Sequence, residues 1–156
     1  MQLTPKEGSL LQELQAQEKL CVEKYGRYAA SACDPRLRQL FGAIGAAESR
    51  HLQTLSAIGS GSLPQQQSQQ GQQQGQQQQQ QPGGSAPAQD SPEWQQDRYL
   101  CTDALTTEKH ASGLYDTGVF EFADPAVRQA LNRIQSEEQG HGLSIYEYMN
   151  RNGMYN

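Results

Sequence analysis

The feature that most constrains the fold of this chain is an internal repeat at a fixed offset of 90 residues. Residues 10–58 align with residues 100–148 without a gap and give eleven identities in 49 positions, where average composition would give roughly three by chance. The identical positions of the first copy are Leu10, Glu18, Lys19, Tyr25, Asp34, Pro35, Arg38, Gln39, Ile44, Glu48 and His51. A repeat sets the architecture, so each half of the chain is expected to form one structural unit.

The two copies are separated by residues 59–90, which are almost entirely Gly, Ser, Pro and Gln. Fifteen glutamines fall between Gln65 and Gln89, and such a composition buries too little apolar surface to offset the entropy of ordering it. We expect a disordered connector, with a glutamine-rich adhesive or cross-linking segment as the alternative. As a coil, the connector spans roughly 30 Å, which is enough to travel the length of a helix.

Each copy is predicted to be a helical hairpin. Four dipeptides place an oxygen-bearing N-cap residue before a proline at the first helical position: Thr4-Pro5, Asp34-Pro35, Ser91-Pro92 and Asp124-Pro125. These starts, with the apolar periodicity that follows them, predict helices over 5–31, 35–58, 92–122 and 125–150. Two hairpins, 5–58 and 91–153, joined by a long crossover over 59–90, describe a single all-α domain over 1–156 with the architecture of a four-helix bundle.

All four predicted helices carry a seam of apolar residues at alternating spacings of three and four, which is typical of bundle interiors. Each seam is interrupted only near its middle, by a glutamate or by Glu-x-x-His; the interrupting residues are Glu18, Glu48, His51, Glu108, Glu138 and His141. At 1.5 Å per residue, the four glutamates lie at one height, roughly 20 Å from the turn of their hairpin. All six side chains are therefore expected to converge on one layer.

Four carboxylates in a buried layer would repel one another unless they take up protons or hold cations. Two divalent metal ions would neutralise them. One Glu from each of two helices plus Glu-x-x-His from each of the other two is the ligand set of di-iron and di-manganese carboxylate bundles. Oxygen and imidazole ligands suit iron or manganese, and the ligand types also allow zinc. The alternative is a metal-free remnant of such a site.

Two tyrosines, Tyr25 and Tyr115, each follow a predicted ligand by seven residues on the same helical face. They are either core residues or hydrogen-bond donors that orient a ligand carboxylate. Cys21, one turn from Glu18, is interpreted as a small core residue rather than a ligand.

Several segments outside the connector are similar to those of a known family: Leu3–Glu7, Glu18–Tyr25, Tyr99–Tyr115 and Ile145–Tyr155. In these segments the chain resembles the spore coat protein F family, within the ferritin-like superfamily. The resemblance implies a ferritin-like bundle from a spore-forming bacterium, made in the mother cell and deposited on the spore coat. The glutamine-rich insertion is not part of the family pattern.

Two functions fit these features. The first is a structural coat component that packs with other coat proteins or with itself. The second is a redox enzyme or metal-handling protein acting on peroxide, superoxide or dioxygen, which would be a di-metal oxidoreductase of the peroxidase, catalase or ferroxidase type. The predicted ligand set lacks the extra carboxylate that some peroxidase members carry, so the substrate class stays open.

Charge and composition argue against other classes of function. A net charge of −5 and a pI near 5.1 argue against nucleic acid binding, and the apolar runs are far shorter than the ~20 residues of a membrane span. The N-terminus lacks the basic region and apolar core of a secretory signal. Three cysteines without C-x-x-C spacing predict reduced thiols, as expected for a protein made in the cytoplasm.

Overall fold

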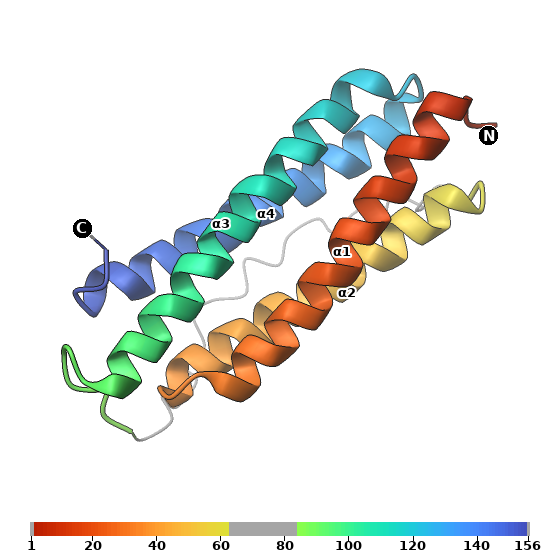
Figure 1. Ribbon diagram of the computed structural model, residues 1–156. Helices are drawn as coiled ribbons and strands as arrows, with labels where there is room; N and C mark the ends of the chain where they lie inside the picture. Colours follow the sequence, from red (N-terminus) through yellow and green to blue (C-terminus); the bar gives the residue numbers. More distant parts are fainter. Residues whose placement is uncertain (1, 63–83, 156) are drawn as a thin grey trace, which may run out of the picture.

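The computed structural model describes residues 2–62 and 84–155, and all regular secondary structure in these ranges is helical. Four helices follow one another in the chain: α1 (Pro5–Ser31), α2 (Pro35–Gly59), α3 (Pro92–Glu121) and α4 (Pro125–Arg151). α1 packs against α2 and α3 against α4, so that two hairpins form one bundle (Figure 1). The prediction of an all-α four-helix bundle is confirmed, and no predicted helix end is wrong by more than one residue.

The helices begin where the capping chemistry predicts. Thr4 forms a capping box with Glu7 at the start of α1, and the side chains of Asp34, Ser91 and Asp124 each accept a hydrogen bond from a backbone N–H of the first turn of their helix. Proline occupies the first helical position in all four cases, where its missing N–H costs no hydrogen bond.

The helices α2 and α3 begin at the same end of the bundle and run in the same direction (Figure 1). Asp97, near the start of α3, accepts hydrogen bonds at 2.6 and 2.9 Å from the backbone N–H groups of Cys33 and Asp34, in the turn between α1 and α2. The end of α2 and the start of α3 therefore lie at opposite ends of the bundle. Of the predicted disordered connector, residues 63–83 lie outside the described residues, and Gly59 belongs to α2.

The predicted seams form the core of the bundle. Two apolar clusters fill its two ends, one around Tyr25, Phe41 and Ile145, the other around Leu14 and Leu131. Every predicted seam residue is buried except His141, which is partly exposed. The six polar interruptions lie between the two clusters, so a polar layer divides an otherwise apolar interior. No helix in the described ranges is long and apolar enough to cross a membrane.

Two acidic side chains at repeat-equivalent positions tie each hairpin to the turn of the other. Asp97 bonds the turn of the first hairpin, and Glu7 accepts a hydrogen bond at 2.9 Å from the backbone N–H of Ala123, in the turn of the second hairpin. The carboxylate of Asp97 is fully buried. These bonds between the hairpins were not predicted from the sequence, although extending the seams one turn toward the helix starts leads to both positions.

Replacing Asp97 by alanine is expected to lower the free energy of unfolding by about 2–4 kcal/mol, because two backbone donors lose their acceptor. Asp97→Asn keeps one acceptor oxygen and should lose less. Urea unfolding followed by circular dichroism measures both effects, and Glu93→Ala, which removes an exposed acid from the same helix, is the control. Equal unfolding midpoints for Asp97→Ala and the control would show that the buried carboxylate contributes nothing.

Candidate metal centre

The six predicted ligands lie together in the middle of the bundle and come from all four helices. Their ligand atoms form two overlapping groups, and within each group all atoms lie within 4.8 Å of one another. One group holds Glu18, Glu48, His51 and Glu138; the other holds Glu48, Glu108, Glu138 and His141. Glu48 and Glu138 belong to both groups and therefore lie where the two groups overlap.

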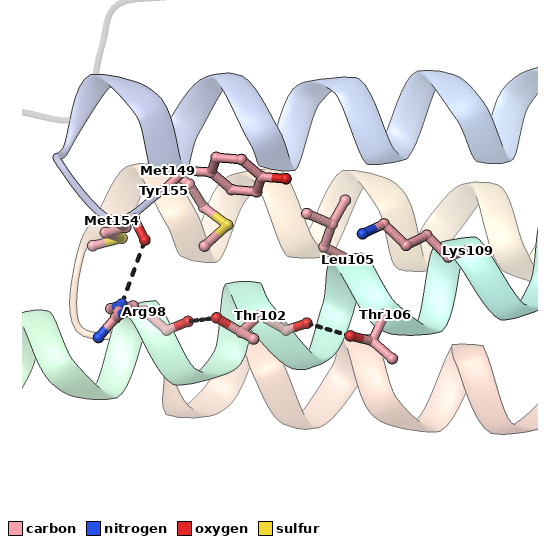
Figure 2. A pocket seen from close by; sticks show the side chains of 8 residues that line it. All are labelled: Arg98, Thr102, Leu105, Thr106, Lys109, Met149, Met154 and Tyr155. Carbon is pink, nitrogen blue, oxygen red and sulfur yellow. Dashed lines mark hydrogen bonds between the residues drawn. The ribbon is translucent and has the colours of Figure 1, made fainter.

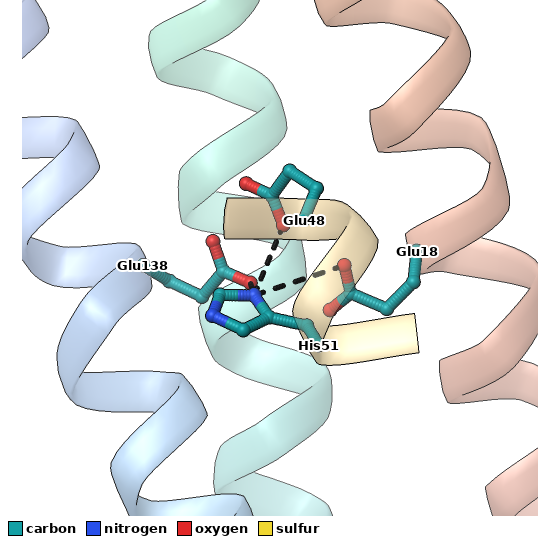
Figure 3. Close-up of side chains that lie close together, drawn as sticks. All are labelled: Glu18, Glu48, His51 and Glu138. Atoms are coloured by element: carbon teal, nitrogen blue, oxygen red, sulfur yellow. Dashed lines mark hydrogen bonds and ion pairs between the residues drawn. The ribbon is translucent and has the colours of Figure 1, made fainter. Parts of the chain in front are cut away.

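The imidazole of His51 presents its Nδ1 atom to the carboxylates of the first group (Figure 3). This atom lies 3.1 Å from Oε2 of Glu48, 3.2 Å from Oε1 of Glu138 and 3.9 Å from Oε2 of Glu18. The side chain is only 3% exposed. Carboxylates from three helices thus surround one imidazole nitrogen at contact distance.

His141 repeats the arrangement in the second group. Its Nδ1 atom lies 3.1 Å from Oε1 of Glu48, 3.3 Å from Oε2 of Glu138 and 3.8 Å from Oε2 of Glu108. The two imidazole rings stack, with centroids 5.9 Å apart. His141 is more open to solvent than His51, with 14% of its side chain exposed.

Each of the two predicted tyrosines donates a hydrogen bond to a glutamate of the other repeat. The hydroxyl of Tyr25 on α1 donates to Oε1 of Glu108 on α3, and the hydroxyl of Tyr115 on α3 donates to Oε1 of Glu18 on α1. Burial and the neighbouring carboxylates raise the pKa of both hydroxyls, so both remain donors. Both rings are also fully buried. Each tyrosine therefore packs in the core and also hydrogen-bonds a carboxylate.

One oxygen of each glutamate is buried and makes no well-aligned hydrogen bond with the described residues: Oε2 of Glu18, Oε1 of Glu48, Oε2 of Glu108 and Oε1 of Glu138. Those of Glu48 and Glu138 lie only within ion-pair distance of an imidazole nitrogen. Leaving a buried polar atom without a partner is unfavourable. Such a set of oxygens beside two imidazole nitrogens has the donor chemistry of a site for divalent cations. The residues present therefore fit a pair of metal ions.

Burial and mutual contacts shift the pKa values of the six clustered side chains. Burial raises the pKa of Glu18 to about 10 and of Glu108 to about 8. Burial also opposes ionisation of Glu48 and Glu138, but their hydrogen bonds with the two histidines outweigh it and lower both pKa values. For the histidines, burial is outweighed by hydrogen bonds to carboxylates, and the pKa rises to about 10 for His51 and about 12 for His141. The lowered pKa values of Glu48 and Glu138 and the raised pKa values of both histidines therefore favour charged pairs among these four side chains.

A seventh residue, Glu137, belongs to this cluster and was missed from the sequence. Its Oε2 atom lies 2.7 Å from the Nε2 atom of His51. Glu137 is partly exposed and lies beside the seam rather than on it, so the seam pattern does not predict a role for it. The available signal was the Glu137-Glu138 doublet, because the equivalent residue of the first copy is Ala47.

The residues around the cluster have simpler roles. Cys21 is buried, accepts a hydrogen bond from the side chain of Gln17 and belongs to neither ligand group, in agreement with its interpretation as a core residue.

The two glycines beside His141 are not required by close helix packing. A Cβ atom at Gly140 would meet nothing within 4 Å, and one at Gly142 would make ordinary contacts of 3.7 and 3.9 Å.

A groove of about 230 Å³ lies elsewhere, on the surface formed by α3 and α4 (Figure 2). Its lining includes Arg98, Lys109, Met149, Met154 and Tyr155 but none of the clustered glutamates or histidines. Tyr155 is exposed, and its ring packs edge-on against that of Tyr146, with centroids 4.9 Å apart. The groove therefore shares no residue with the metal centre.

The chain matches no curated protein and no solved structure. A family model described as the Coat F domain matches residues 96–156. These residues include nearly all of α3 and the whole of α4, which supply Glu108, Glu138 and His141. The match to the Coat F domain therefore covers nearly all of the second hairpin of this chain.

Proposed function

We propose that this chain is a spore coat component whose helical bundle holds two divalent metal ions, iron or manganese. The coat assignment is supported by the Coat F domain of residues 96–156. The observation that carries the metal assignment is the pair of overlapping groups of carboxylates and imidazoles in the buried layer. Both features coincide in the second hairpin, which supplies half of the ligands.

In this proposal each residue has a defined role. Glu48 and Glu138 would be shared by the two metal positions, Glu18 and His51 would complete one, and Glu108 and His141 would complete the other. Tyr25 and Tyr115 hold the carboxylates of Glu108 and Glu18 through hydrogen bonds that cross between the repeats. The apolar clusters at both ends of the bundle exclude water and restrain the ligands. Bound iron or manganese would supply Lewis-acid and one-electron redox chemistry in this dry layer.

Assembly into a coat is supported by exposed aromatic and aliphatic side chains on α3, α4 and the tail that follows. Tyr99, Leu143, Tyr146 and Tyr155 are all exposed. Side chains of this kind are suited to contacts with other coat proteins or with further copies of the chain.

Fractionation of spores, with an antibody against this chain, tests the coat assignment. We expect the protein in the washed coat fraction, and its recovery only from vegetative cytoplasm would contradict the proposal.

The tyrosine hydrogen bonds give a prediction specific to each position. Tyr115→Phe should weaken metal binding at the position completed by Glu18, and Tyr25→Phe at the position completed by Glu108. We expect losses of about tenfold, which is typical for groups that orient a ligand. Titration with Mn(II), followed by electron paramagnetic resonance, measures both steps in each variant. Tyr28→Phe, which changes a neighbouring tyrosine that bonds Asp103 instead, is the control. Identical titrations of all three variants and the parent would refute the prediction.

A redox activity toward peroxide, superoxide or dioxygen is the second candidate. The observation in its favour is the partial exposure of His141 beside two glycines that packing does not require, because a small oxidant needs access to the metal layer. Metal-loaded protein should then consume peroxide, or oxidise Fe(II), faster than the same metal in buffer. Rates equal to the buffer control would remove this candidate and leave the structural one.

A further inference from the structure

The carboxylate of Glu137 distinguishes the two histidines of the metal centre. Glu137 is on α4, and its Oε2 atom lies 2.7 Å from Nε2 of His51 on α2. The opposite ring nitrogen of His51, Nδ1, faces Glu48 and Glu138 at 3.1 and 3.2 Å. One ring edge is therefore held by a carboxylate outside the ligand set, while the other edge points into it.

The internal repeat provides a direct comparison, because the residue equivalent to Glu137 in the first copy is Ala47. Ala47 is buried and has no side-chain acceptor. His141 presents the same nitrogen, Nδ1, to Glu48 and Glu138 at 3.1 and 3.3 Å. The two rings therefore use the same ligand atom, but only His51 has a carboxylate at this repeat-equivalent position behind it.

A carboxylate that accepts a hydrogen bond from Nε2–H leaves the lone pair of the imidazole on Nδ1, fixes the ring orientation and makes Nδ1 a better donor to a metal. We infer that Glu137 is a positioning residue for His51 alone, so that the two metal positions are unequal and the His51 position fills first. This inference rests on the proposed metal site and concerns the order and strength of binding.

Titration of the full-length, metal-free protein with Co(II), followed by its visible absorption, tests the inference. We expect two resolved steps in the parent protein. Glu137→Ala should weaken the tighter step by about 10- to 100-fold and leave the weaker step unchanged. Glu137→Gln should recover part of the loss, because its amide oxygen can still accept the hydrogen bond. Glu147→Ala, which changes an exposed glutamate of the same helix, should have no effect.

The two histidines provide the decisive backgrounds. In His51→Ala protein the further change Glu137→Ala should have no effect on Co(II) binding, whereas in His141→Ala protein it should have its full effect. An equal effect in both backgrounds would overturn the inference and identify Glu137 as a ligand in its own right. Two equal steps that Glu137→Ala leaves unchanged would overturn it while the proposed metal site stands. Absence of Co(II) binding by the parent protein would overturn both.

Discussion

Glutamine at position 48 or 138 is expected to abolish the binding of both metal ions, because each of these carboxylates belongs to both ligand groups. Glutamine keeps the size of the side chain but replaces a charged ligand by a neutral amide, and it removes one of the two carboxylates that both positions share. Metal analysis after loading with Mn(II) and desalting should give two ions per chain for the parent protein. We expect close to none for Glu48→Gln and Glu138→Gln.

The matched controls are the two glutamates that belong to one group each. Glu18→Gln should lose the ion beside His51 and keep the other, and Glu108→Gln should lose the ion beside His141 and keep the other. Circular dichroism of the metal-free variants checks that each one folds. If all four variants retained the same number of ions, the division into bridging and terminal carboxylates would be wrong.

Stabilisation of the fold by metal is expected to increase steeply from pH 5 to pH 8. In the metal-free protein, burial raises the pKa of Glu18 to about 10 and of Glu108 to about 8, above the ordinary value of 4.5. The pKa values of both histidines are raised above 6.5 by their carboxylate partners. Such groups stabilise the fold most at pH values below their unfolded pKa, and this contribution is lost as the pH rises through the folded value. The metal-free protein should therefore lose stability across this range.

Metal binding reverses this trend. Ligands must be deprotonated to bind, so the same four groups release protons as the ions enter. For each proton that is released, metal binding becomes about tenfold tighter per unit rise in pH. Because the folded state holds the ions, this adds about 1.4 kcal/mol to the free energy of unfolding. Thermal melts of metal-free and Mn(II)-loaded protein should separate further at each step from pH 5 to pH 8. Glu138→Gln should remove the separation, and a separation that is constant or narrows with pH would contradict the prediction.

The helices could be predicted from the sequence because their signals are local. An Asx, Ser or Thr residue followed by proline marks each start, and the observed starts are the predicted ones. The seam could be predicted because a spacing of three and four describes one face of one helix. The repeat then placed Glu18, Glu48, Glu108 and Glu138 at one height along the bundle. This height predicted the layer in which the six side chains meet.

What the sequence did not show depends on which helices become neighbours. The repeat indicates that Tyr25 and Tyr115 have equivalent roles, but only the packing of α1 against α3 shows that each bonds the glutamate of the other copy. The bonds that Asp97 and Glu7 make between the hairpins were missed for the same reason, since their partners are backbone groups of the opposite hairpin. Glu137 was missed because it lies on the flank of a seam.

The buried layer is proposed to bind two metal ions. Native mass spectrometry of the folded chain, loaded anaerobically with Fe(II) or Mn(II) and freed of excess metal, tests this proposal most directly. The predicted result is a single dominant species whose mass exceeds that of the chain by two metal ions, in place of the protons they displace. Detection of the bare chain alone under both conditions, with melting curves identical before and after loading, would contradict it.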